Sequence, residues 1–281
     1  MNLLKNNILL LYITLFLHSI SGFAQNLFDL EHSLKFADYL FENTLYKEAA
    51  AEYERVIFLD SLGQNAKLQC IKAYEYSGDY AMAQKKLNAF YAESNFLSPE
   101  VLYQKYRLLI LQQNFNAFGI DFFENSKFEP TDKAILGSSA AIISGNFELA
   151  AELLKQQAGS NNEILQNYSL LLNDAGKTTH KSVAVAVLLA AVLPGSGKIY
   201  TGYWKDGLIT LAFTGLSALQ AYRGFEKSGI TSTYGWIYAG MTTGFYLGNI
   251  YGAGKSAYKH NHEKKHKIIH RAEAIFTNYR R

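Results

Sequence analysis

Hydrophobic residues in the first two thirds of the chain recur every three or four positions, which is the spacing of an amphipathic helix. The aromatic residues Tyr46, Tyr80, Phe115 and Phe147 are 34, 35 and 32 residues apart, and in three of the four cases alanine follows three positions later. Such a small residue lets two antiparallel helices approach closely, while the aromatic ring fills the corner between them. The pattern predicts stacked helix pairs over residues 30–173.

The period, the aromatic residue and the alanine together resemble the tetratricopeptide repeat over about residues 30–157. The third unit departs from the pattern, because Phe118 stands where alanine is usual. The resemblance implies a concave groove for an extended peptide or a partner helix. If the helical phase carries over, the groove is lined by Leu34, Asp38, Phe41, Leu68, Lys72, Glu75, Tyr103, Arg107, Ile110 and Ile142. The alternative is that these residues pack between neighbouring helices.

The N-terminal residues have the layout of a cleavable secretory signal. Lys5 precedes an apolar run from Ile8 to Leu17, and small residues lead up to Ala24. We expect a signal over residues 1–24 and an exported repeat domain over residues 25–176. Cys70 is the only cysteine, which excludes an intramolecular disulfide and leaves the domain to be held by packing.

The composition changes after Gly176. Three apolar segments, 183–193, 208–222 and 234–258, each approach the ~20 residues that a membrane-spanning helix requires. We therefore expect a transmembrane helical domain over residues 177–258 and a basic tail over residues 259–281. The fold class predicted for the whole chain is all-α, a helix-pair repeat solenoid followed by a C-terminal α-helical transmembrane domain.

Charge differs sharply between the two parts. Residues 25–176 carry 12 Lys and Arg against 20 Asp and Glu, whereas residues 177–281 carry 14 against 4. A basic excess just past the last span marks the cytoplasmic side. With the repeat domain exported, this predicts three crossings and a cytoplasmic tail. A re-entrant first segment would instead leave two crossings, with the tail outside the cytoplasm.

Glycine recurs every four residues in the third apolar segment, at Gly240, Gly244, Gly248 and Gly252. Such a stripe allows close approach of a second helix. The expected neighbour is segment 208–222, with a homo-oligomer formed through the same stripe as the alternative. Thr242 is expected on the opposite face.

A second glycine-rich block, Leu193 to Gly207, includes Pro194, Gly195, Gly197 and Gly202. It resembles small bacterial membrane domains with a Pro-Gly-x-Gly-x-x-Tyr-x-Gly signature, which implies a membrane turn and residence in the inner membrane. Lys198 gives the block a likeness to a phosphate loop. However, Ile199 stands where the magnesium-binding hydroxyl is required, so nucleotide binding is not predicted.

The sequence His262-Glu-Lys-Lys-His266 would place two imidazoles on one helix face for zinc, with Glu263 as general base and His270 as a third ligand. Few residues follow it to build a substrate cleft, and the lysines disfavour a dication. A solvated basic helix near anionic lipid headgroups is the preferred interpretation.

The predicted function is that of an envelope scaffold. The repeat domain would recruit a protein or peptide outside the cytoplasm, and the membrane domain would anchor it in the lipid bilayer. We expect no catalytic residue, metal, cofactor or nucleic acid. The alternative function is a membrane-bound zinc hydrolase that uses the histidine segment.

Overall fold

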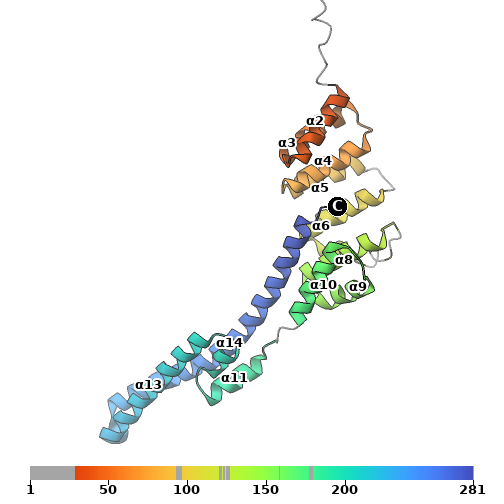
Figure 1. Cartoon of the computed structure of the whole chain (residues 1–281). Coiled ribbons are helices and arrows are strands. Elements are labelled where there is room, and N and C mark those ends of the chain that lie inside the picture. The colour runs from red at the N-terminus through yellow and green to blue at the C-terminus, as the bar shows by residue number, and fades with distance from the viewer. Residues whose placement is uncertain are drawn as a thin grey trace, which may run out of the picture. The chain divides into compact units, whose positions relative to one another are not determined.

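A computed structural model describes residues 29–92, 97–119, 122, 124, 127–157, 159–176 and 180–280. Every regular element in these ranges is a helix, as Figure 1 shows, so the all-α prediction is confirmed for them. The predicted signal sequence lies outside the described residues. The chain divides into two compact units, Met1–Asn114 and Phe115–Arg281.

The first unit is a succession of helices in which each packs on the next. Side chains of Asp29, Asp79 and Ser98 accept hydrogen bonds from first-turn amides and so fix where three of the helices begin. The helices are α2 (Leu30–Glu42), α3 (Tyr46–Leu59), α4 (Gln64–Tyr76), α5 (Tyr80–Tyr91) and α6 (Pro99–Leu111).

Small residues and aromatic rings form the core of the first unit, as the repeat pattern predicts. Ala49 and Ala83 are fully buried at helix contacts. The ring of Tyr46 lies 5.3 Å from that of Phe41 and 5.4 Å from that of Tyr76. Tyr46 therefore fills the corner where α2, α3 and α4 meet.

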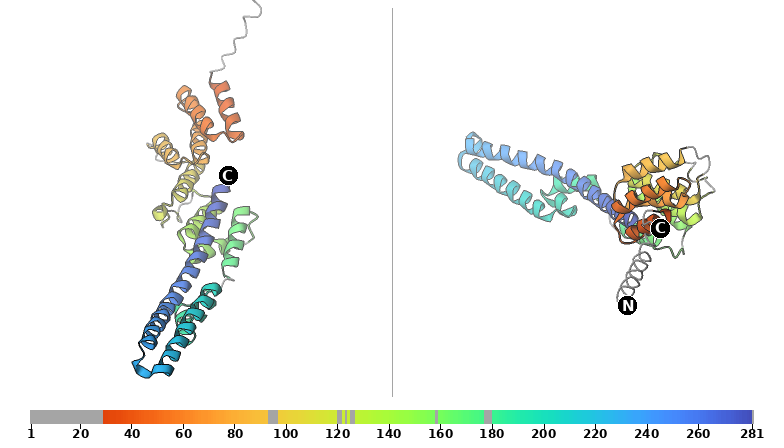
Figure 2. Two further views of the ribbon diagram at one scale, coloured as in Figure 1. Left: turned by 90° about the vertical axis from the view of Figure 1, so that its left-hand side faces the viewer. Right: turned by 90° about the horizontal axis from the view of Figure 1, so that it is seen from above.

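The second unit begins with the 3-10 turn η1 (Phe115–Ala117) and continues through α8 (Pro130–Ser144), α9 (Phe147–Gln156) and α10 (Glu163–Gly176). Four further helices follow, with the 3-10 turn η2 (Gly229–Thr231) before the last. They are α11 (Val183–Val192), α12 (Ser196–Tyr200), α13 (Trp204–Ser228) and α14 (Thr233–Asn278). Helix α13 and the first half of α14 form the hairpin seen in Figure 2.

Helix α14 is a single helix of 46 residues, so the predicted boundary at residue 258 falls inside it. Its last turns pack on α8 and α10. Ala272 and Phe276 are buried there, and the Tyr168 hydroxyl donates to the Ala272 carbonyl at 3.4 Å. These contacts place the last turns of α14 beside α8 and α10. The number of membrane crossings and the side on which the tail lies stay predictions.

Within the described part of the chain, no helix combines the length and the hydropathy needed to cross a membrane. The predicted spanning segments are therefore not confirmed. Helix α11 has only 10 residues. Helix α13 carries Lys205 and Asp206 near one end and Arg223 near the other, while the apolar part of α14 is rich in glycine, threonine and tyrosine.

The glycine stripe does not form the contact with α13. A Cβ added at Gly240, Gly244 or Gly248 would meet nothing within 4 Å, and only at Gly252 would it approach a side chain, that of Lys198. The face that contacts α13 is instead that of Thr242, whose hydroxyl donates to Ser217 Oγ at 3.0 Å. The pairing of α13 with α14 was predicted correctly, but the contacting face of α14 was not. Pairing between copies through the stripe stays a prediction.

Candidate functional site

The residues predicted to line a groove divide into two groups. One group is buried and packs between helices rather than lining an open surface: Glu75, Tyr103, Arg107, Ile110 and Ile142. The other group is partly exposed: Leu34, Asp38, Phe41, Leu68 and Lys72. Asp38 accepts a hydrogen bond from the Tyr53 hydroxyl at 2.6 Å, and Leu34 and Phe41 pack against the core.

A buried ion pair joins α4 to α6. Arg107 Nε donates to Glu75 Oε1 at 2.6 Å, and the side chains are 3% and 2% exposed. The Gln104 amide donates to the other oxygen of Glu75. Because both charged groups are buried away from water, each is stabilised by the presence of the other. The pair therefore fixes how α4 and α6 pack. It is a structural feature rather than a ligand site.

The glycine block predicted as a membrane turn is a packed junction of α11, α12 and α14. Gly195 has φ +88°, and its amide donates at 2.9 Å to Asn249 Oδ1. The Asn249 amide donates in turn to the Ala190 carbonyl at 2.9 Å. Glycine at position 197 allows α12 to touch α11, since a Cβ there would lie 2.1 Å from the Ala186 carbonyl oxygen. Gly202 also has positive φ, and Pro194 precedes the turn.

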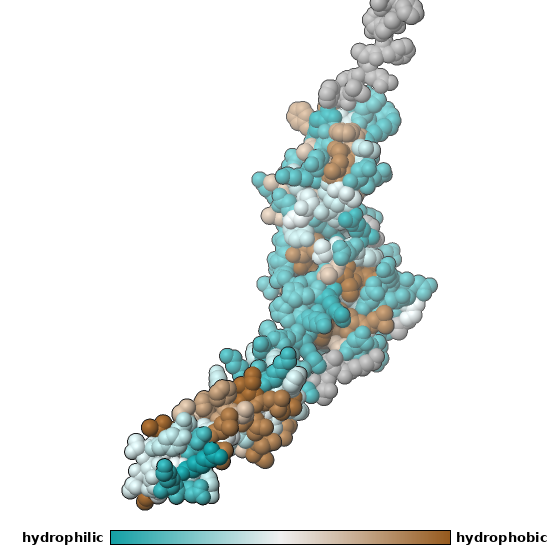
Figure 3. Space-filling model, turned by 60° about the vertical axis from the view of Figure 1, so that its left-hand side comes forward, coloured by the Kyte–Doolittle hydropathy of each residue, from teal (hydrophilic) through white to brown (hydrophobic). Residues whose placement is uncertain are grey.

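On α13, small residues form the buried face and large apolar residues lie on the exposed side, whereas the glycine stripe of α14 is itself largely exposed. The face of α13 that is buried consists of Gly207, Thr214, Ser217, Ala221 and Gly224. On its other side, Ile209, Phe213 and Leu216 are 56%, 58% and 61% exposed. Helix α14 likewise exposes Trp236, Ile237 and Leu247. In Figure 3 the broadest brown area lies on the lower part of the molecule, which holds these helices, while the end of that part is mainly white and teal.

The tail histidines form a row on one exposed face of α14. The rings of His262 and His266 are 5.7 Å apart, and those of His266 and His270 are 4.2 Å apart. His270 Nδ1 also lies 2.9 Å from Glu273 Oε2. Among the described residues, no group of three or more His, Cys, Asp or Glu side chains is placed to hold a metal ion.

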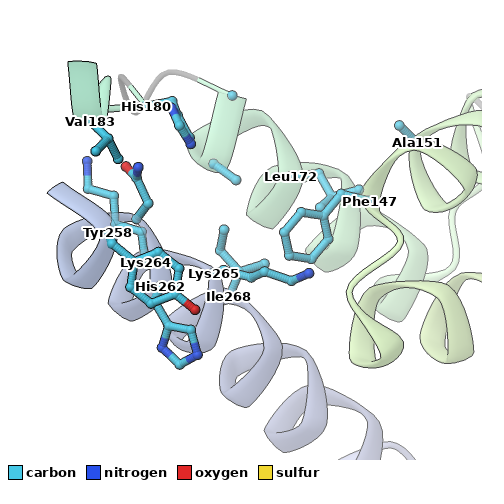
Figure 4. A pocket seen from close by; sticks show the side chains of 13 residues that line it. Phe147, Ala151, Leu172, His180, Val183, Tyr258, His262, Lys264, Lys265 and Ile268 are labelled. Atoms are coloured by element: carbon cyan, nitrogen blue, oxygen red, sulfur yellow. The ribbon is translucent and has the colours of Figure 1, made fainter. Parts of the chain in front are cut away.

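A cleft of about 760 Å³ lies between α9 and α10 on one side and α11 and α14 on the other, as Figure 4 shows. Its lining combines apolar side chains with a basic edge. The apolar residues include Phe147, Leu172, Val183 and Ile268, and the polar ones are His180, Asn261, His262, Lys264 and Lys265.

The cleft was not predicted from the sequence. Its walls come from residues as far apart as Phe147 and Ile268, and only the packing of α14 on α8 and α10 brings them together. The one signal in the sequence is the pair Lys264 and Lys265, which was assigned to a solvated tail. No protein-family model matches the chain, and neither curated proteins nor solved structures gave a match.

Proposed function

We propose that this protein is a membrane-associated helical-repeat scaffold whose hairpin, α13 with the first half of α14, sits in lipid. The observation that supports this proposal is that α13 buries small residues and exposes large apolar ones. In water, large apolar side chains are buried, and apolar patches of this extent mark interaction surfaces. In lipid, helices associate through small residues such as Gly207, Ser217 and Gly224, and large apolar residues face the acyl chains.

The lengths of the uncharged stretches support an inserted hairpin. Helix α13 carries no charge from Gly207 to Tyr222, which at 1.5 Å per residue covers about 24 Å. This is less than the ~30 Å of the hydrocarbon layer. Helix α14 is uncharged from Thr233 to Gly254, or about 33 Å. Within the uncharged stretch of α13, the polar residues Thr214 and Ser217 lie on its buried face.

The insertion can be tested by alkaline extraction of membranes from cells that express the full chain. The wild-type protein should remain in the membrane pellet. The Ile209→Glu/Leu216→Glu double variant should be released, because each charge facing lipid costs roughly 2 to 3 kcal/mol. Phe58→Glu is the matched control, since Phe58 is 88% exposed but lies on α3, and it should stay in the pellet. Release of the wild-type protein would contradict the proposal.

The first unit would supply the surface that recruits a protein or peptide. The partly exposed Leu34 and Leu68 lie on α2 and α4, the first helices of the predicted pairs. A photo-reactive amino acid at position 68 should form discrete adducts in cells, and Leu34→Glu should remove them. The same amino acid at Phe58 should form none of these adducts. Identical adducts from positions 58 and 68 would exclude a specific surface on α4.

A further inference from the structure

The cleft between α10 and α14 has an apolar interior and a cationic edge. Phe147, Leu172 and Ile268 give it apolar walls, and none of its lining residues is acidic. Its volume of about 760 Å³ lies within the range of ligand pockets, ~300 to 1,000 Å³. The lining therefore offers apolar contact and positive charge in the same space.

The lysines at the edge are not paired with carboxylates, and Lys265 Nζ also lies beside Gly145 at the C-terminal end of α8. In the described part of the chain, neither Lys264 nor Lys265 forms an ion pair. Lys265 Nζ lies 5.8 Å from the centre of the Phe147 ring, at the apolar wall of the cleft.

His260 lies beside the same positive charges. The pKa of His260 is lowered, first by burial and then by the positive charges of Lys264 and Lys181. The nearby carboxylate, Glu263, is 3.0 Å from the Tyr203 hydroxyl that donates to it and 3.7 Å from Lys259 Nζ. An anion that entered the cleft would thus meet positive charge.

The place of the cleft along α14 matches the edge of the apolar hairpin. The uncharged stretch of α14 ends at Gly254, and Tyr258 lines the cleft one turn later. Val183, at the start of the apolar helix α11, lines the same cleft. If the hairpin sits in lipid as proposed above, the cleft opens at the level of the headgroups, where tyrosine and lysine are favoured.

We propose that this cleft binds one single-chain anionic amphiphile, with its acyl chain against Phe147, Leu172 and Ile268 and its carboxylate or phosphate paired with Lys264 or Lys265. Each methylene that leaves water adds to affinity, and the two lysines select for a negative head. The membrane level of the cleft rests on the proposed function, whereas the binding chemistry follows from the cleft itself.

Binding can be measured on the full chain in a neutral detergent by displacement of a fluorescent long-chain fatty acid. Unlabelled fatty acid and lysophosphatidic acid should both displace it with one site per chain. A monoacylglycerol of the same chain length should be at least ten-fold weaker, and inorganic phosphate should not displace the probe. Equal competition by the neutral monoacylglycerol would overturn the proposal, and competition by phosphate alone would replace the amphiphile with a simple anion.

Two variants locate the site. Lys264→Gln/Lys265→Gln should weaken fatty acid binding at least ten-fold, while Lys205→Gln/Lys227→Gln, two cations on α13 outside the cleft, should leave it unchanged. Amide hydrogen exchange of α10 and α14 checks that both variants are folded. Wild-type affinity in the first variant would overturn the assignment. Neither variant changes the lipid-facing residues, so alkaline extraction tests the inserted hairpin separately.

Discussion

Gly197→Leu is expected to prevent α11, α12 and α14 from packing together. A Cβ at this position would lie 2.1 Å from the Ala186 carbonyl oxygen and 2.8 Å from the Ala253 Cβ. The first neighbour is backbone, so the strain cannot be relieved by turning a side chain. Overpacking costs ~1 to 3 kcal/mol even where side chains can adjust. We expect the variant to lose about 3 kcal/mol of folding stability or more. The loss would appear as less folded protein recovered in mild detergent, measured by size-exclusion chromatography.

Gly244→Leu provides the matched control, since it makes the same change in α14, another helix of the same unit. Gly244 is exposed and has nothing within 4 Å of an added Cβ. Leucine also has a higher helix propensity than the glycine that it replaces. Recovery of the folded monomer should therefore equal that of the wild type. Equal recovery of both leucine variants would refute the junction, and loss of a dimer in Gly244→Leu alone would show that the stripe joins two copies.

Glu75→Ala is expected to destabilise the first unit by about 3 to 5 kcal/mol. Removal of the carboxylate leaves Arg107 charged and buried, and it also removes an acceptor from Gln104. The loss should appear as faster amide exchange in α4 and α6 of the full chain, and as a lower free energy of unfolding. Lys35→Ala is the control, because its pair with Glu31 is 70% and 74% exposed, and it should cause no measurable change.

The effect of the buried charge on stability can be separated from the effect of the lost side-chain volume. The double variant Glu75→Met/Arg107→Met replaces both charges with apolar side chains, and should recover most of the stability, since apolar replacement of a buried ion pair is often neutral. If the double variant were as unstable as Glu75→Ala, packing rather than the unpaired charge would account for the effect.

Local sequence signals were sufficient to predict helix class and several helix starts. Tyr46, Tyr80 and Phe147, the aromatic anchors of the period, are the first residues of α3, α5 and α9. Two of these starts are fixed by Asp79 and Asn146, whose side chains accept bonds from the first-turn amides. Capping and periodic spacing depend on residues close together in the chain, and so can be read without the fold.

Which face of a helix is covered was decided by the tertiary structure. Glu75 and Arg107 become buried because α4 packs on α6, and Thr242 rather than Gly244 faces α13 because of how the hairpin closes. The cleft exists because the last turns of α14 pack on α8 and α10. The segment that was predicted from the sequence to be a basic tail is therefore part of the folded unit. The sequence by itself determined that the chain is helical, periodic in its first part and basic in its last, since those properties are local. Contacts between residues more than a hundred positions apart, such as Tyr168 with Ala272, depend on a balance of packing and desolvation that only the folded chain defines.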